Sequence, residues 1–238
     1  MQDRTKKLPL WVEYGEIYLD WLLGAGDGSH PTKPIRAKNA VAKLVERLKG
    51  SIVVHDPALD ADVEADKIEL AKVHGEAHIH GAVNNYVDSL WGGPSESMSR
   101  AGLAMFRGTV RAVRALLAGK ARVAFNPQGA KHHAMRDNSS GFCLFNDMAW
   151  AAQEFKAAGL KPLYLDWDIH AGDGVYELLR ETDHHLRPGL LPVELDVRSG
   201  LPAVAAGHLD RTAPDGGVHA DLDLVECRVL VELPASRE

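Results

Sequence analysis

KPLYLDWDIHAGDGVYELL, residues 161–179, is an apolar, strand-like run that ends in several acids and a histidine and continues into a helix-like pattern. If residues 162–169 are extended, side chains alternate, and Asp166, Asp168 and His170 project from one face. Glycines flank Asp173 where the strand gives way to the helix, and α/β proteins place their chemistry at strand ends of this kind. The segment on its own fits both a metal or acid/base site and an acidic surface turn.

The residues upstream of this segment repeat a helix-then-strand step. Apolar residues recur at helical spacing in each expected helix, and a short apolar run follows each helix. Ser97 or Ser99 is expected to cap the second helix. Repeated steps with short connections favour an α/β fold in three layers, with a mainly parallel sheet and helices on both faces. The expected pairs are helix 37–50 with strand 51–56, helix 98–121 with strand 122–125, and helix 146–158 with the strand that begins at residue 162.

Composition sets broad limits on function. The 238 residues are 45% hydrophobic and 25% charged, which is enough for one sizeable core. The net charge of −6 gives no broad basic surface for nucleic acid or for an anionic membrane, so a small or protein-borne substrate is expected. Cys143 and Cys227 provide no disulfide framework, which fits a reducing compartment. With no signal-peptide pattern and no stretch of about 20 apolar residues, a cytoplasmic protein is expected.

The composition changes abruptly near residue 183. Residues 184–238 contain no Lys, Ile, Asn, Gln, Met, Phe, Tyr or Trp. Strands are expected at 191–197 and 223–233, and the residues between them have loop chemistry. We therefore expect an α/β domain over residues 1–183 and a divergent tail over 184–238.

A pair of adjacent histidines, His132 and His133, follows the expected strand at 122–125. A parallel sheet would bring this loop close to Asp166 and Asp173. A carboxylate that pairs with an imidazole fixes its tautomer and raises its basicity, as acid/base catalysis requires. Because the chain has 12 histidines, a chance pair that faces solvent is the alternative.

The two histidine and acid segments together resemble one family. KHHAMRDNSSGFCLFND, residues 131–147, followed by LYLDWDIHAGDGVYELL, residues 163–179, resembles the zinc-dependent histone deacetylases, including their bacterial acetoin-utilisation and acetylpolyamine-hydrolase relatives. HPTKPIR (30–36) and LAKVHGEAHIHGAV (70–83) extend the resemblance, which covers about residues 11–183. It implies the arginase/deacetylase fold, C-terminally incomplete because the likeness is lost after residue 183.

The resemblance implies a role for individual residues and a cofactor. Zn²⁺ or another divalent metal would be expected, with a structural K⁺ near Asp166, Asp168 and the carbonyl of His170. The implied substrate is an acetylated lysine side chain or an acetylated small amine. The implied metal ligands are Asp168 and His170, and the implied catalytic histidines are His132 and His133, with His133 the general base. Asp166 would orient His132, and Asp173 would orient His133. Gly141 and Phe142 would form the wall of the acyl-lysine tunnel, and Arg36 would lie beside the acetate cavity.

The chain departs from the family pattern in its last quarter. Its tyrosines are Tyr14, Tyr18, Tyr86, Tyr164 and Tyr176, so none lies where the family has its catalytic tyrosine. The third zinc ligand has no recognisable counterpart, and Asp196, Asp210 and Asp215 lack the family surroundings. A frame-shifted or unrelated tail after residue 183 would explain both losses.

Three functions therefore stay open: a metal-dependent deacetylase, a non-catalytic protein with the deacetylase fold, and an arginase-like hydrolase, which would not explain GFCLFND.

Two minor expectations concern other residues. The segment with His74, His78 and His80 is expected to be a surface helix. Cys143 is expected to be a small core residue and not a nucleophile.

Overall fold

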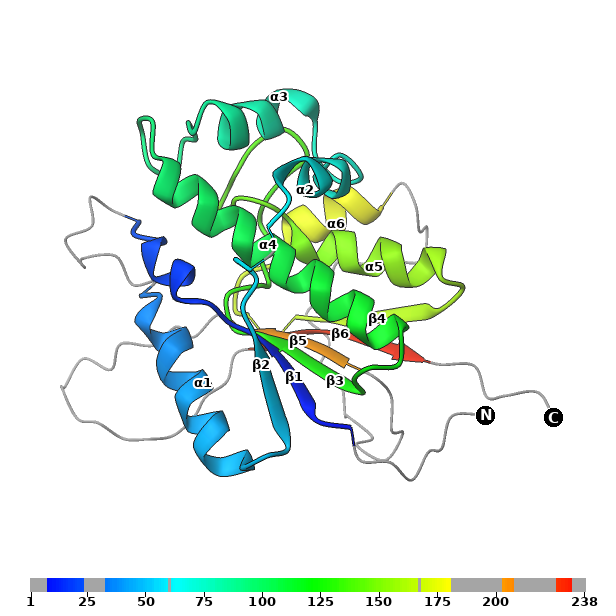
Figure 1. Cartoon of the computed structure of the whole chain (residues 1–238). Coiled ribbons are helices and arrows are strands. Elements are labelled where there is room, and N and C mark those ends of the chain that lie inside the picture. Colours follow the sequence, from blue (N-terminus) through cyan, green and yellow to red (C-terminus); the bar gives the residue numbers. More distant parts are fainter. Residues whose placement is uncertain are drawn as a thin grey trace.

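The computed structural model describes residues 8–23, 33–59, 61–166 and 168–180, and the backbone of two further strands at 203–207 and 226–232 (Figure 1). The three helix–strand steps predicted from the sequence are present as α1–β2, α4–β3 and α5–β4. The elements are β1 (Leu10–Glu13), the 3₁₀ helix η1 (Glu16–Asp20), α1 (Ile35–Leu48), β2 (Ile52–His55), α2 (Val63–Leu70), α3 (Glu76–Ile79), the π-helical turn η2 (His80–Asn84), α4 (Glu96–Leu117), β3 (Val123–Asn126), α5 (Asp147–Ala157), β4 (Lys161–Leu165), α6 (Asp173–Leu179), β5 (Ala203–Gly207) and β6 (Glu226–Glu232).

The described strands form one mainly parallel sheet in the order β2-β1-β3-β5-β6-β4. β1 pairs in parallel with β2 and β3, and β3 pairs in parallel with β5. Only β6 runs the other way, because it is antiparallel to both of its neighbours β5 and β4. The carboxyl ends of β3 and β4 therefore lie at the same edge of the sheet.

Helices cover both faces of this sheet, which confirms the expected α/β layers (Figure 1). On one face α4 and α5 build the main core around Phe106, Trp150 and Ala124. On the other face α1 packs Val41 against Val12 and Phe125. Neighbouring residues of β1 and β3 thus point into different layers, as strand alternation requires.

The long helix α4 begins two residues earlier than expected, with Ser95 as its N-cap. Ser95 has an extended backbone (φ −144°, ψ 101°), and its side chain accepts a hydrogen bond from the N–H of Met98. Ser97 and Ser99 lie inside the helix, so the expected caps are wrong. The reason is that capping needs a non-helical residue just before the first turn.

The expected alternation across residues 162–169 is also wrong. β4 ends at Leu165, and the N–H of Asp168 donates to Asp166 Oδ1 at 3.0 Å, so the chain turns immediately after the strand. Asp side chains commonly accept from a backbone N–H two residues on and so favour a turn over an extended strand. Asp166, Asp168 and His170 come together through this turn.

The C-terminal segment supplies two strands to the sheet. β6 confirms most of the strand expected at 223–233, whereas β5 lies in a segment whose composition indicated a loop. Backbone pairing with β3 and β6 outweighs this local preference. The strand expected at 191–197 lies outside the described residues, and the domain boundary at residue 183 stays a prediction.

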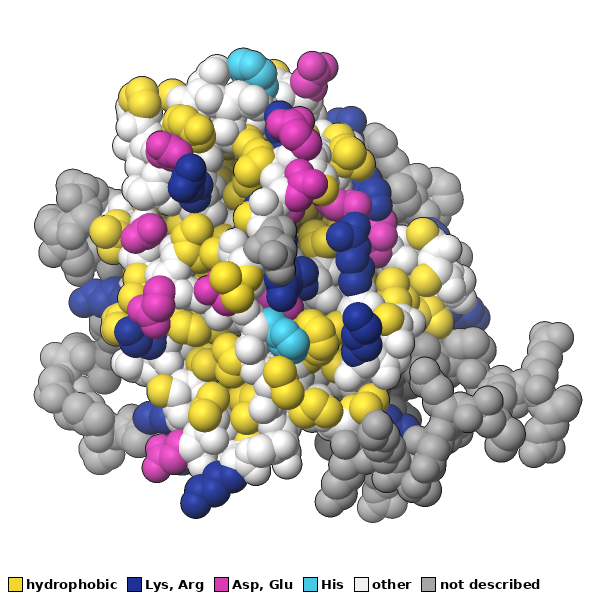
Figure 2. All heavy atoms as spheres, viewed as in Figure 1, with side chains coloured by type: hydrophobic (Ala, Val, Ile, Leu, Met, Phe, Trp, Pro, Cys, Tyr) yellow, Lys and Arg dark blue, Asp and Glu magenta, His cyan; other side chains and the backbone are white. Residues whose placement is uncertain are grey.

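Two broad surface properties can be followed on the described residues. On the face shown in Figure 2, acidic and basic side chains are interspersed. Among the described helices, none combines the length and the apolar character that crossing a membrane requires.

Candidate functional site

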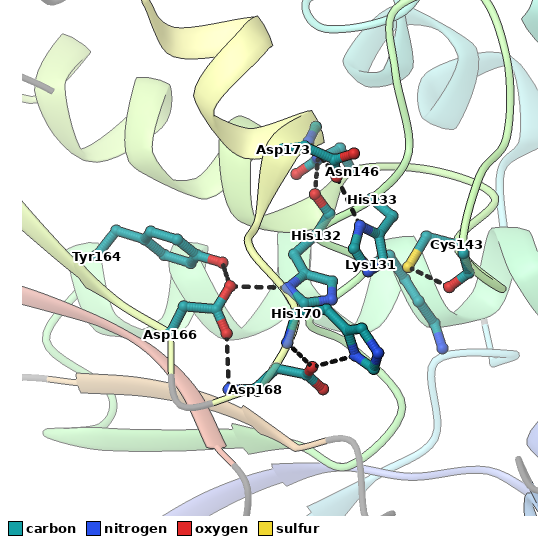
Figure 3. Close-up of polar contacts among 12 residues, drawn as sticks. Lys131, His132, His133, Cys143, Asn146, Tyr164, Asp166, Asp168, His170 and Asp173 are labelled. Atoms are coloured by element: carbon teal, nitrogen blue, oxygen red, sulfur yellow. Dashed lines mark hydrogen bonds and ion pairs between the residues drawn. The ribbon is translucent and has the colours of Figure 1, made fainter. Parts of the chain in front are cut away.

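The candidate site lies where β3 and β4 end and α6 begins (Figure 3). His132 and His133 stand on the loop that follows β3, and Asp166 is the first residue after β4. Asp173 is the first residue of α6. The parallel sheet therefore gathers at one edge side chains that are up to 41 positions apart in the chain.

Each histidine of the pair contacts its own carboxylate. His132 Nδ1 lies 2.7 Å from Asp166 Oδ2, and His133 Nδ1 lies 2.6 Å from Asp173 Oδ1. The two imidazole centroids are 4.1 Å apart. When Nδ1–H donates to the carboxylate, the other ring nitrogen, Nε2, is the one that can accept a proton, which is the arrangement that a general base needs.

Further contacts hold Asp166 in place. Tyr164 donates its hydroxyl to Asp166 Oδ2 at 2.5 Å, and a Cβ added to Gly172 would lie 2.7 Å from the same oxygen. Sequence reasoning did not identify Tyr164 as part of the site. The signal was available, because Tyr164 precedes Asp166 by two positions and strand neighbours of that spacing share a face.

Asp168 and His170 form the part of the site that is suited to a cation. His170 Nδ1 and the His170 N–H each lie 2.8 Å from Asp168 Oδ1. Burial acts to raise the pKa of Asp168, but the hydrogen bonds from His170 outweigh it, so the net pKa is lowered and the carboxylate is ionised. The rings of His170 and His133 are 6.0 Å apart. The donor set of one carboxylate and one imidazole therefore lies next to a potential base.

The described part of the chain supplies no third ligand to this pair. None of its groups of His, Cys, Asp and Glu brings three such side chains together as a metal site would. A zinc site usually has three protein ligands and an open position or four ligands. Asp168 and His170 therefore fit as part of a zinc site but do not complete one. The other acids considered from the sequence, Asp196, Asp210 and Asp215, lie outside the described residues.

Glycines allow the close packing around the two histidines. Gly141 has a φ of +50°, and a Cβ there would lie 2.3 Å from His133 Cδ2. A Cβ on Gly174 would lie 2.4 Å from the carbonyl oxygen of Ala134 and 2.7 Å from that of His132. Only a residue without a side chain fits at these two positions.

The residues expected at the substrate differ in how the structure places them. Gly141 lies against His133, and the next residue, Phe142, is 40% exposed with a φ of +66°. Arg36 lies in the first turn of α1 and is partly buried. The tunnel wall and the acetate cavity to which these residues were assigned stay predictions.

The loop before the histidines contains a strained residue and a buried lysine. Ala130 has a φ of +59°, a conformation that costs a non-glycine residue roughly 1–2 kcal/mol. Lys131 is 4% exposed, and its Nζ has no hydrogen-bond partner, although it lies 5.8 Å from the ring centroid of Trp21. Burial lowers the pKa of Lys131, while Cys143 and Asp147 act in the opposite direction.

The prediction of a surface helix for the upstream histidines is wrong for two of them. His74 and His78 are 2% and 7% exposed, whereas His80 is exposed. His74 Nδ1 lies 2.9 Å from the carbonyl of Met135, and His74 Nε2 accepts from the N–H of Asn146 at 2.9 Å. Burial lowers the pKa of His74 to about 3, so the ring is neutral.

No helical period marks this burial, because α2 ends at Leu70, α3 begins at Glu76, and His74 lies in the turn between them. The expectation failed because a histidine can join an apolar face when its ring nitrogens find partners, and those partners come from segments far away in the sequence.

Cys143 is buried as expected, and burial raises the pKa of its thiol to about 11.

Comparison with known proteins places this geometry in a family. The sequence profile of the histone deacetylase domain matches residues 30–187, which is well over half of the chain. The chain belongs to the histone deacetylase family. This confirms the resemblance drawn from the two motifs.

Several curated members of the histone deacetylase family are similar to part of this chain. Histone deacetylase 8 of Xenopus tropicalis is 38% identical over 96 residues, which cover 37% of this chain and 26% of that protein. The acetoin utilization protein AcuC of Bacillus subtilis is 36% identical over 39% of this chain and 27% of its own length. Histone deacetylase 6 of Arabidopsis thaliana is 28% identical over 69% of this chain and 37% of its own length. The chain thus spans well under half the length of these relatives.

A solved structure supports the fold. The crystal structure of the HDA15 HD domain matches 74% of this chain and 51% of that domain, with a TM-score of 0.59 and 24% identity. At that level of identity the likeness establishes the deacetylase fold.

Proposed function

We propose that this deacetylase-family chain is a metal-dependent amidohydrolase that removes acetyl groups from acetyl-lysine or from acetylated small amines. The observation that carries the proposal is the double histidine–carboxylate arrangement, with Nδ1 to oxygen distances of 2.7 and 2.6 Å, beside Asp168 and His170. A surface turn would have no reason to orient two imidazoles in this way. Membership of the family supports the same reaction.

His133 is the proposed general base. Its contact with Asp173 directs Nε2 away from that carboxylate, so Nε2 is free to remove a proton from a water molecule at the amide carbonyl. Asp173 then stabilises the imidazolium that forms, and the protonated ring can return the proton to the leaving amine. His132, held by Asp166, gives a second oriented imidazole beside the first.

Asp168 and His170 are the proposed metal ligands. A bound Zn²⁺ would supply Lewis-acid polarisation of the acetyl carbonyl and a lower pKa for the water. The third ligand would have to come from outside the described residues, and a structural K⁺ near Asp166 and Asp168 is part of the same proposal. The geometry supports cation binding, because the carboxylate of Asp168 and the ring of His170 lie side by side, with 2.8 Å between Oδ1 and Nδ1.

Metal analysis combined with an acetate-release assay tests the proposal. The purified chain, supplied with Zn²⁺, is expected to release acetate from an acetyl-lysine peptide or an acetylated polyamine. His133→Ala is expected to lower that rate by about 10²–10⁴-fold, which is the usual contribution of a general base. His80→Ala, which alters an exposed histidine, is the control and should leave the rate unchanged. Folded, zinc-loaded protein that releases no acetate from either substrate would refute the proposal.

A second function is favoured by two observations. Among the described residues only two metal-ligand side chains converge, and the sequence has no tyrosine after residue 176 to stabilise an oxyanion. In that case the chain is a deacetylase-fold protein that binds acetylated amines without hydrolysing them. Saturable binding of an acetyl-lysine peptide without acetate release, weakened by a substitution at Gly141, would support this function. Hydrolysis that depends on His133 would exclude it.

A further inference from the structure

Asp147 contacts the loop that carries the catalytic histidine pair, although sequence reasoning gave it no role. It is the first residue of α5 and is 1% exposed. Its carboxylate accepts hydrogen bonds from the hydroxyl of Thr109 at 2.6 Å and from the backbone N–H groups of Ala130 and Lys131 at 3.1 and 2.8 Å. Two of these three donors are backbone N–H groups of Ala130 and Lys131, the residues immediately before His132.

The conformation of Ala130 makes this contact more than a chance hydrogen bond. With a φ of +59°, Ala130 turns its own N–H and the N–H of Lys131 toward the same carboxylate. Consecutive N–H groups arranged in this way form a small anion-binding concavity, and here the anion is a side chain of the protein. An acceptor in that concavity therefore compensates for a backbone conformation that alanine rarely adopts.

The neighbouring residue holds the other end of the same loop. Asn146 donates its side-chain amide to the carbonyl of Ala134 at 3.0 Å, while its own N–H donates to His74 Nε2 at 2.9 Å. Its Oδ1 caps α5 by accepting from the N–H of Ala149. Two consecutive residues at the start of α5 thus bracket residues 130–134.

We propose that Asp147 is a positioning residue that sets the placement of His132 and His133 opposite their carboxylates by fixing the backbone of Ala130 and Lys131. It acts through the loop and touches neither imidazole. The inference rests on the proposed function for its catalytic consequence. Its structural consequence, a change in the environment of the two imidazoles, can be measured whether or not the chain hydrolyses anything.

Asp147→Asn is the direct test, because it preserves shape but replaces one acceptor oxygen by an N–H₂ that cannot accept from a backbone N–H. Hydrogen exchange at the Ala130 or Lys131 amide is expected to become at least tenfold faster. The ring ¹⁵N signals of His132 and His133, assigned with His132→Gln and His133→Gln, are expected to shift. If the chain is active, kcat should fall by up to about 10²-fold with little change in KM, since the chemistry and not the binding contacts is misplaced.

Asp66→Asn is the matched control. Asp66 is also a buried carboxylate, 5% exposed, but it accepts from Arg107 in the contact between α2 and α4. Its loss should destabilise the fold without moving the signals of His132 and His133. This comparison separates an effect on the histidine loop from general destabilisation.

Ala130→Gly provides a rescue experiment. Glycine adopts a positive φ without a side-chain penalty, so the loop would keep its shape with less help from Asp147. In the Asp147→Asn background this change should return the histidine signals, and any activity, part of the way to those of the original chain. In the Asp66→Asn background it should leave the histidine signals unmoved.

A milder variant covers the case in which Asp147→Asn does not fold. Thr109→Val removes one hydrogen bond to the carboxylate while retaining the carboxylate itself, and should shift the same histidine signals by a smaller amount. The inference is overturned if these variants lower stability yet leave the signals of His132 and His133 as they are in Asp66→Asn. Histidine signals that shift as expected in a chain that hydrolyses nothing would uphold the positioning role and count against the proposed hydrolysis alone.

Discussion

Buried His74 should make the fold sensitive to mild acid. Its folded-state pKa is lowered to about 3 from an ordinary 6.5, first by burial and then by the nearby His78. Between these values the unfolded chain binds a proton that the folded chain does not, so the free energy of unfolding falls as the pH drops below about 6.5. From pH 7 to pH 5 the loss from this one residue is about 2 kcal/mol.

His74→Gln is the perturbation that isolates this contribution. Glutamine carries a donor and an acceptor, so it can partly replace the contacts with Met135 and Asn146, but it does not titrate. Urea unfolding of both proteins at pH 7 and pH 5 gives the two pH-dependent losses, and their difference should be about 2 kcal/mol. Other titrating groups are shared by both proteins and largely cancel in this difference.

The control for this measurement is His80→Gln, which removes an exposed histidine from the same segment. It should lose stability between pH 7 and pH 5 by the same amount as the original chain. The reasoning is refuted if His74→Gln also shows the full pH dependence, because His74 would then not be held in its neutral form.

Three further predictions concern other buried positions. Burial raises the pKa of Glu13 to about 7 from 4.5, so the free energy of unfolding should fall as the pH rises from about 4.5 to 7. In urea unfolding, the Glu13→Gln variant should show this fall reduced by up to about 3 kcal/mol. Lys131→Met should raise the free energy of unfolding by about 1–3 kcal/mol in urea at pH 7, because it replaces a buried amine without a hydrogen-bond partner with an apolar chain; unchanged or lower stability would contradict this. Gly174→Ala places a Cβ 2.4 Å from the carbonyl oxygen of Ala134 and should lower the free energy of unfolding by about 1–3 kcal/mol, measured by thermal unfolding. The control Gly93→Ala adds its Cβ in open space and should lower it by less than about 1 kcal/mol.

Much of the site could be predicted from the sequence because its chemistry lies in two short segments. Four residues carry the proposed reaction. His132 and His133 are adjacent, Asp168 and His170 are two positions apart, and each pair follows a recognisable apolar strand. Asp147 was visible within the same motif, but its role depends on Thr109 and on the strained loop, and no periodicity reports such a contact.

The sequence alone determined three helix–strand steps and the edge of the sheet at which the acids and histidines meet, because both follow from local periodicity and from the rule that parallel strands share a carboxyl edge. Only the tertiary structure decided that the chain turns sharply after Asp166 and that His74 is buried and neutral. The strand β5 also formed where local composition indicated a loop. The burial of His74 and the formation of β5 depend on partners that are distant in the sequence, and the free energy of those contacts outweighs the local preferences of the residues themselves. The turn after Asp166 instead follows from a local hydrogen bond to the N–H of Asp168.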